Sequence, residues 1–254
     1  MKIDTLKLLM GRPLTLNKEY DIKVKQPLIS EIVDLGEDNY NRYLRPFVIT
    51  TEFIFNGLEN EEKLINQFDL YDLFFINDEK GNSVLNHIFD GHNALDVIKE
   101  SLSFFLDTND IQILQRQKVF GINGEYSLNK NEFSKMKRIV QAITRSSDIE
   151  VDKPPKNMTK KQRDIWKKLQ KGRKRQSEKN AIYTQDIINY VSFGGKNYIS
   201  KNQIDEMTYY ELRNAYKSIL GIDSFNIALG YKLSEKYEVK EDIKHWTETL
   251  KIGK

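Results

Sequence analysis

Residues 153–179 read KPPKNMTKKQRDIWKKLQKGRKRQSEK, and this stretch organises the rest of the chain. It holds twelve Lys or Arg against only Asp164 and Glu178, which gives it a net charge of +10. The whole chain has 40 basic and 37 acidic residues, so everything outside the stretch sums to about −7. A mildly acidic body therefore carries one strongly basic segment.

The order of residues in this stretch predicts an extended break followed by a helix. The paired prolines at 154–155 form a rigid break, and Thr159 stands where a helix N-cap is preferred. Ile165, Trp166 and Leu169 then supply a narrow apolar stripe, while the remaining positions are mostly charged. We expect one face of this helix to dock and the rest to be solvated.

Three interpretations of the basic segment remain open. It is a solvated linker helix, a docking element for an acidic protein partner, or a binding site for nucleic-acid phosphates. Trp166 is the only aromatic residue in the segment that could stack on a base. The basic patch that a phosphate contact would use consists of Lys160, Lys161, Arg163, Lys167, Lys168, Arg173, Lys174 and Arg175.

Composition favours a folded protein of a reducing compartment. The 254 residues are 39% hydrophobic and 11% aromatic, which is enough to build a core. The absence of cysteine excludes disulfides and cysteine-based metal or nucleophile chemistry. No apolar run reaches the ~20 residues that a membrane crossing needs, and the first residues do not resemble a signal peptide. We therefore expect a soluble intracellular protein without membrane contact.

Residues 1–150 are predicted to form a helical N-terminal domain with small β elements. Short strands are expected near residues 14–16 and 20–24, and helices from Pro27 to Gly36 and from Glu37 onward. Residues 47–54 are apolar and could be a strand or a helix, because so short a run does not reveal its period.

The rest of this domain is expected to be helical over residues 60–108, followed by a hairpin and a long helix. Asn123 and Gly124 form a two-residue hairpin signal between apolar segments. Asn131 is expected to cap a helix over 132–144 whose apolar residues share one face.

The remaining chain is predicted to hold a basic linker helix at 151–180 and a smaller, all-helical C-terminal domain at 181–254. One helix should end at the glycine pair 194–195, and two more should be separated near Met207. Thr208 and Glu211 have the spacing of a capping box. The fold class is therefore mainly α, with some β structure (α+β).

No catalytic or metal-binding pattern stands out. His87, Asp90 and His92 are close in sequence, but Gly91 should break any helix that would align them. The glycine-rich loops that bind phosphate and the serine motif of hydrolases do not occur. We therefore expect no catalytic residue, no metal and no cofactor, and hence a protein that is not an enzyme.

Three segments resemble tail-assembly chaperones and related tail-module proteins of long-tailed phages of Gram-positive bacteria. They are LKLLMGRPLTLNKEYDIKVKQPLISEIVDLGEDNYNRYL, IWKKLQKGRKR, and MTYYELRNAYKSI with the closing HW. The chain departs from the simplest members, which are shorter and lack so large an N-terminal part. That departure leaves a structural tail or neck component as an alternative.

The resemblance implies a non-enzymatic protein of the bacterial host cytoplasm. It would hold the aggregation-prone tape-measure protein during virion morphogenesis, while tail-tube protein assembles on the tape-measure protein. The chain could also form a homo-oligomer. Helix-in-groove contact is one way to shield such a partner. The candidate partner-binding residues under this hypothesis are Trp166, Tyr209, Tyr210, Tyr216 and Trp246. The main alternative from another class is a nucleic-acid-binding module that uses the basic patch.

Overall fold

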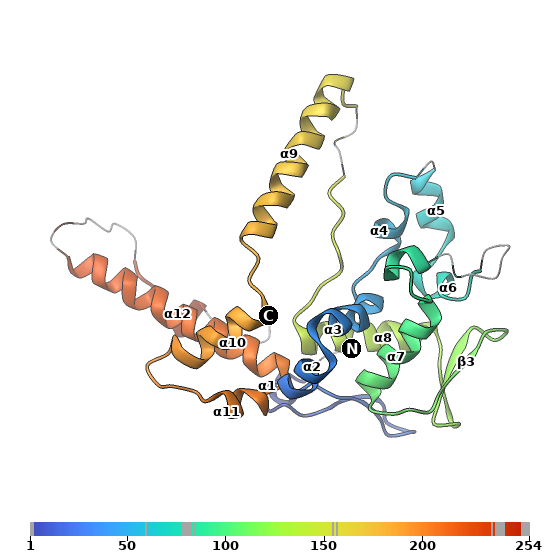
Figure 1. Ribbon diagram of the computed structural model, residues 1–254, viewed down its shortest axis with the longest axis horizontal. Coiled ribbons are helices and arrows are strands. Elements are labelled where there is room, and N and C mark those ends of the chain that lie inside the picture. The colour runs from blue at the N-terminus through green and yellow to red at the C-terminus, as the bar shows by residue number, and fades with distance from the viewer. Residues whose placement is uncertain are drawn as a thin grey trace.

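The computed structural model describes residues 3–58, 60–77, 83, 85–153, 155, 157–234, 236 and 242–249, with the backbone alone described at 174, 178 and 249. Helices dominate, and they are accompanied by two small antiparallel sheets of two and three strands. The expected mainly α (α+β) class is therefore confirmed. Figure 1 shows a body from which two helices, α9 and α12, extend in different directions.

The chain begins with a short helix and the first hairpin. Helix α1 (Thr5–Leu9) is capped by Asp4, and strands β1 (Leu14–Asn17) and β2 (Ile22–Val24) follow. Leu14 pairs with Val24 in antiparallel register, so alternate apolar side chains of both strands are buried. The two short strands expected near 14–16 and 20–24 are thus confirmed.

Short helices make up the next part of the body. Helix α3 (Glu37–Leu44) begins where the sequence indicated, whereas α2 (Ile29–Leu35) begins two residues after Pro27, with Leu28 as its N-cap. The ambiguous stretch 47–54 contains no strand, because the 3-10 helix η1 (Arg45–Phe47) precedes α4 (Thr51–Phe55) there. Helix α4 begins where the hydroxyl of Thr50 accepts a hydrogen bond from the backbone N–H of Phe53 over 3.1 Å.

Four helical elements and a second sheet complete the body before α8. The helical elements are α5 (Glu61–Gln67), α6 (Leu70–Leu73), η2 (Asn86–Phe89) and α7 (Ala94–Leu106). The sheet has the order β3 (Ile111–Leu114), β4 (Val119–Ile122), β5 (Tyr126–Leu128). The predicted hairpin is confirmed, and Asn123 and Gly124 both have positive φ, but Ile122 pairs with Tyr126, so the loop has three residues and not the expected two.

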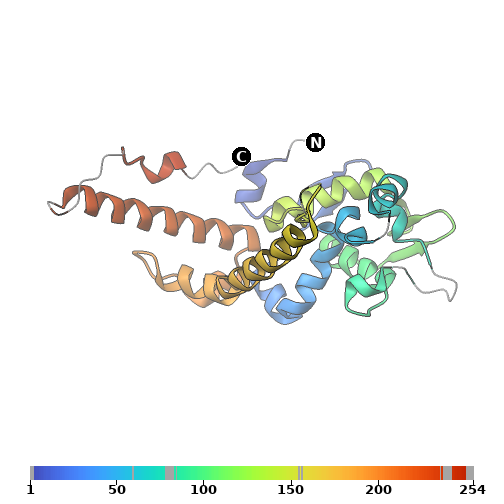
Figure 2. The ribbon, with the colours of Figure 1, turned by 90° about the horizontal axis from the view of Figure 1, so that it is seen from above.

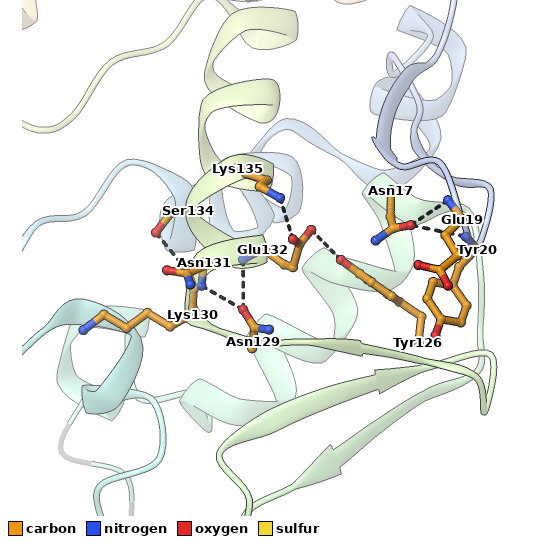
Figure 3. Close-up of polar contacts among 10 residues, drawn as sticks. All are labelled: Asn17, Glu19, Tyr20, Tyr126, Asn129, Lys130, Asn131, Glu132, Ser134 and Lys135. Carbon is orange, nitrogen blue, oxygen red and sulfur yellow. Dashed lines mark hydrogen bonds and ion pairs between the residues drawn. The ribbon is translucent and has the colours of Figure 1, made fainter. Parts of the chain in front are cut away.

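Helix α8 (Lys130–Thr144) is capped two residues earlier in sequence than expected. Asn129, and not Asn131, is the N-cap, because its Oδ1 accepts hydrogen bonds from the backbone N–H groups of residues 131 and 132 at 2.9 and 3.2 Å. Figure 3 shows this cap beside a second contact, in which the Tyr126 hydroxyl donates to Glu132 over 2.7 Å. Lys135 approaches the other carboxylate oxygen of Glu132 to 2.6 Å. The start of α8 is thereby tied to strand β5.

An aromatic core surrounds α8. The ring of Phe133 stacks on Phe47 at 5.6 Å with an interplanar angle of 20°. Phe105 meets Phe47 edge to face at 5.4 Å, and the hydroxyl of buried Tyr71 donates to the backbone carbonyls of residues 118 and 128. Such pairs add to the free energy gained by removing apolar surface from water. The apolar face predicted for this helix is buried as expected: Phe133, Met136, Ile139, Val140 and Ile143.

The C-terminal part consists of helices only among the residues described after 180. They are α10 (Thr184–Phe193), α11 (Lys201–Asp205), α12 (Tyr209–Leu233) and α13 (Trp246–Thr249). The capping box at the start of α12 is confirmed, because Thr208 Oγ1 accepts from the Glu211 N–H at 3.2 Å and Glu211 Oε2 accepts from the Thr208 N–H at 2.7 Å. Helix α12 then continues for 25 residues.

The start of α12 is docked on the N-terminal part. The N–H of Tyr209 donates to the carbonyl of Pro27 over 2.8 Å, and the N–H of Ile29 donates to the carbonyl of Met207 over 2.9 Å. Buried residues of α10, α11 and α12 belong to the same hydrophobic cluster as the N-terminal core. Figures 1 and 2 both show the far half of α12 extending beyond the body. The domain limits at 150 and 181 stay predictions, but the two parts share one core.

Candidate functional site

Two exposed helical surfaces are candidates for contact with partners. The first is helix α9 (Lys160–Lys179), which we call the basic arm. Thr159 starts it as expected: its hydroxyl accepts from the Gln162 N–H at 3.3 Å, and its own N–H donates to Gln162 Oε1 at 2.8 Å. A helix of 20 residues is about 30 Å long, and Figure 1 shows the basic arm projecting from the body.

The basic side chains of the arm are exposed. Among those that the structure describes, only Arg173 is within ion-pair distance of a carboxylate, at 3.6 Å from Asp152. Gln170 donates to the same Asp152 over 2.6 Å, so one side of the arm lies beside the extended segment that leads into it. The side chain of Lys174 lies outside the described residues. The exposed members of the predicted basic patch are Lys160, Lys161, Arg163, Lys167, Lys168, Arg173 and Arg175.

The apolar stripe of the arm is open to solvent. Ile165 is 49% exposed and Leu169 is 57% exposed, whereas Trp166 is half-buried. These exposed apolar side chains are flanked by lysines, as the sequence indicated. The stripe is thus available to a partner in this structure.

Two of the five candidate partner-binding residues, Tyr209 and Tyr210, pack against the N-terminal part of the chain instead. Tyr210 is only 4% exposed, and its ring lies under the guanidinium of Arg145 at 4.4 Å. Tyr209 is half-buried, with its ring 5.6 Å from that of Tyr40. Both residues hold α12 on the N-terminal part. Tyr210 is therefore not accessible to a partner, and this part of the expectation needs correction. Sequence periodicity does not show which turns of a helix pack against the rest of the chain and which turns are exposed.

Tyr216 lies further along α12, and Trp246 is the first residue of α13. Tyr216 packs edge to face on Tyr190 at 5.3 Å. The hydroxyl of Tyr190 donates to Asp223 over 2.5 Å, and this hydrogen bond is the main cause that raises the pKa of Tyr190 to about 12. Trp246 is half-buried and lines two hollows of about 470 and 530 Å³ against α12. Trp166 lies on the basic arm, so the structure does not bring the five candidates into one surface.

The second surface is the far half of α12, which the sequence analysis did not single out. We call its exposed apolar residues the apolar tip; they are Leu220, Ile227, Leu229, Tyr231 and Leu233, with exposed fractions from 37% to 76%. Helices that are apolar on more than one face are usually buried. This property of residues 220–233 was the signal in the sequence that could have identified the surface.

A third feature is a groove of about 970 Å³ beside α3 and α7. Leu35, Tyr43 and Phe104 provide its apolar lining, and the carboxylates include Asp96 and Glu100. Burial, and secondarily the Glu100 carboxylate, raise the pKa of Tyr43. We call this feature the acidic groove.

Asp90 and His92, from the His87, Asp90 and His92 pattern in the sequence, contact arginine side chains. His92 Nε2 lies 2.9 Å from Arg42 Nη1, and Asp90 pairs with Arg45 at 2.8 Å. Within the described ranges, no three His, Asp or Glu side chains gather as metal ligands would. The described helices also include none with the length and apolar character needed to cross a membrane.

Comparison with known proteins yields no relative. The chain matches no protein-family model, no curated protein and no solved structure.

Proposed function

We propose that this chain is a non-enzymatic, chaperone-like protein of phage tail assembly that binds the tape-measure protein in the bacterial host cytoplasm. The observation that carries the proposal is the apolar tip, which adds to the three segments that resemble tail-assembly chaperones. Leu233 is 76% exposed and Ile227 is 59% exposed on a helix whose first turn is fixed in the core. An exposed apolar surface on a rigidly held helix suits binding of another amphipathic helix.

The physical argument rests on the contrast between the two halves of α12. The first half is held by backbone hydrogen bonds and buried side chains, of which Leu212 is fully buried. The far half is contacted by residues 242–249, as in the ring pair of Phe225 and His245 at 4.8 Å, and it keeps exposed apolar side chains at the apolar tip. Burying each such side chain against a partner would contribute ~1 to 3 kcal/mol. The tape-measure protein would be such a long helical partner, and successive copies of this chain could bind along it. Tail-tube protein would be a further partner.

One observation favours a second candidate function, namely nucleic-acid binding. The seven described members of the basic patch are exposed, and only Arg173 lies near a carboxylate. Phosphate binding would require such free cations, and its affinity would fall steeply with salt. We expect no appreciable nucleic-acid binding at physiological salt, because Trp166 is the only aromatic side chain on the arm. A structural role in the tail or neck of the virion is the remaining alternative.

Co-expression with the tape-measure protein of the same genome tests the proposal. The native chain should raise the soluble yield of that protein and co-purify with it. The double variant Ile227→Ser, Leu229→Ser should lower capture by about tenfold or more, which is the effect of losing ~1.4 kcal/mol. Val33→Ser with Leu58→Ser is the matched control, since both residues are exposed apolar side chains elsewhere, at 62% and 54%.

The outcomes separate the candidates. A tape-measure protein that is equally soluble alone, with no complex formed, would refute the chaperone role and favour a structural tail or neck component. Sub-micromolar retention of DNA or RNA at physiological salt would favour the nucleic-acid function instead. Equal loss of capture in the control variant would show that the apolar tip is not the binding surface.

A further inference from the structure

The charge of the basic arm is left almost entirely uncompensated within the described part of its own chain. Arg173 lies 3.6 Å from Asp152, and the other described basic side chains of the arm have no carboxylate within 4 Å. Ile165 and Leu169 remain open beside these charges. The arm therefore offers a short apolar stripe bordered by cations over about 30 Å.

The acidic groove offers the complementary surface. Its lining combines the apolar side chains of Leu35, Tyr43 and Phe104 with carboxylates of Asp96 and Glu100. The helices that form it carry an excess of acidic residues over Arg42 and Lys99. These acidic residues are Glu31, Asp34, Glu37, Asp38, Asp96 and Glu100, and Asp107 follows at the C-terminal end of α7.

Lys25 and Lys99 both line this groove, and Lys25 is already paired with carboxylates. Lys25 Nζ lies 2.6 Å from Glu31 and 3.2 Å from Asp107, and it sits 4.9 Å over the ring of Phe104. Burial alone would lower the pKa of Lys25, but the two carboxylates outweigh burial and raise it. The charged residues of the lining are then Asp96, Glu100 and Asp107 against Lys25 and Lys99, which leaves a net charge of −1 to attract cations from outside.

We propose that the basic arm of one copy binds the acidic groove of a second copy of this chain, and that the contact is reciprocal in a two-fold dimer. The stripe of Ile165 and Leu169 would meet the apolar lining, and lysines such as Lys167 and Lys168 would meet Asp96 and Glu100. We choose a second copy of this chain as the occupant because of its charge distribution. Residues 153–179 have a net charge of +10, and the rest of the same chain has a net charge of about −7. A self-complementary surface of this kind closes naturally into a symmetric pair.

The arm does not fill the groove of its own chain in this structure. Figure 1 shows α9 projecting away from α3 and α7. The segments before and after the arm are held to the body: Lys153 pairs with Glu61 at 2.9 Å, and the hydroxyl of Thr184 donates to Glu37 at 2.6 Å. A second copy can supply its arm without breaking either contact.

Charge reversal tests the proposal on the full chain after nuclease treatment. The arm variant is Lys167→Glu with Lys168→Glu, and the groove variant is Asp96→Lys with Glu100→Lys. Sedimentation equilibrium should show a dimer of the native chain at low salt, whose Kd rises about tenfold or more when the salt is raised from about 50 to 500 mM. Each variant alone should be at least about tenfold weaker in self-association. An equimolar mixture of the two variants should regain the dimer, because positions 167 and 168 of each arm then face positions 96 and 100 of opposite charge.

A control variant tests whether the loss of self-association is specific to the acidic groove. Asp205→Lys with Glu206→Lys changes charge by the same amount as the groove variant on two exposed residues at the C-terminal end of α11, and it should leave the dimer unchanged. Circular dichroism and thermal unfolding check that each variant folds. A native chain that is monomeric at low salt overturns the proposal. So does a dimer that nuclease abolishes, or a mixture of folded variants that stays monomeric.

Discussion

The guanidinium of Arg145 lies 4.4 Å from the ring centroid of Tyr210, and it joins the C-cap of α8 to the first turn of α12. The same side chain donates from Nη2 to Asn214 Oδ1 over 2.9 Å. Arg145 adopts a φ of +51°, the left-handed conformation common at helix ends. One residue thus ends α8 and fixes α12 against it.

Removing this contact should loosen the junction of the two parts. Arg145→Ala should lower the free energy of unfolding by about 1 to 2 kcal/mol, because the cation–π contact and the hydrogen bond are both lost. Arg145→Gly loses the same contacts but tolerates positive φ, so it should recover about 1 kcal/mol relative to the alanine variant. Urea titration measures both. Equal stability of the alanine variant and the native chain would show that the contact contributes nothing.

Glu132 should make part of the stability depend on pH. Burial acts to raise the pKa of Glu132, but hydrogen bonds from Lys135 and Tyr126 outweigh burial and lower its pKa below the ordinary 4.5. A carboxylate with a lowered pKa in the folded state contributes stability that is present above the unfolded pKa and is lost as the pH falls through the folded value.

Glu132→Gln should therefore lower the free energy of unfolding at pH 7 by about 1 to 2 kcal/mol. The difference from the native chain should shrink as the pH falls below 4.5. Denaturant titration at several pH values between 7 and 3 measures this difference. Glu125→Gln is the control, since Glu125 is exposed and should change stability little at any of these pH values. A difference that does not depend on pH would contradict the assignment.

Two glycines in the C-terminal part should respond to alanine in opposite directions. A Cβ at Gly194 would lie 2.6 Å from the backbone carbonyl oxygen of Tyr190, so Gly194→Ala should destabilise the end of α10 by about 1 kcal/mol or more. A Cβ at Gly230 would meet nothing within 4 Å in the helix α12, so Gly230→Ala should stabilise by about 0.5 to 1 kcal/mol. Thermal unfolding of the two variants side by side measures the contrast. The same sign of change in both would refute this interpretation.

Limited trypsin digestion should cut first within residues 153–179, where exposed lysines and arginines are dense. Because α10, α11 and the start of α12 share the N-terminal core, the two fragments should then co-elute in gel filtration until denaturant is added. First cleavage within residues 104–119 would contradict the predicted domain limit. Fragments that separate without denaturant would contradict the shared core.

Local chemistry made much of the fold predictable. The turn at Asn123 and Gly124 needs two residues at positive φ, and few residue pairs other than this one satisfy that need easily. The capping box of Thr208 and Glu211 is likewise encoded by two residues three positions apart. The choice of Asn131 over Asn129 as a helix cap was wrong because both asparagines fit a local pattern, and only the fold of β5 positions Asn129.

Long-range pairing set the limit of the sequence analysis. Whether Tyr210 is buried depends on Arg145 and on the backbone pairing around Pro27, both distant in sequence. In the same way, the exposure of Ile227 and Leu233 depends on which parts of the chain pack against α12 after its first turns. Periodicity shows that a helix has an apolar face, but it does not tell which part of a long helix the rest of the chain will cover.

The position of the basic arm outside an acidic body gives the molecule a large electric dipole moment. A molecule with this charge distribution turns in the field of a charged surface before it touches that surface, so its approach is oriented even where its net charge is small. With an isoelectric point near 8.7, the monomer should still be retained by a cation-exchange column slightly above that pH, because its arm faces the resin.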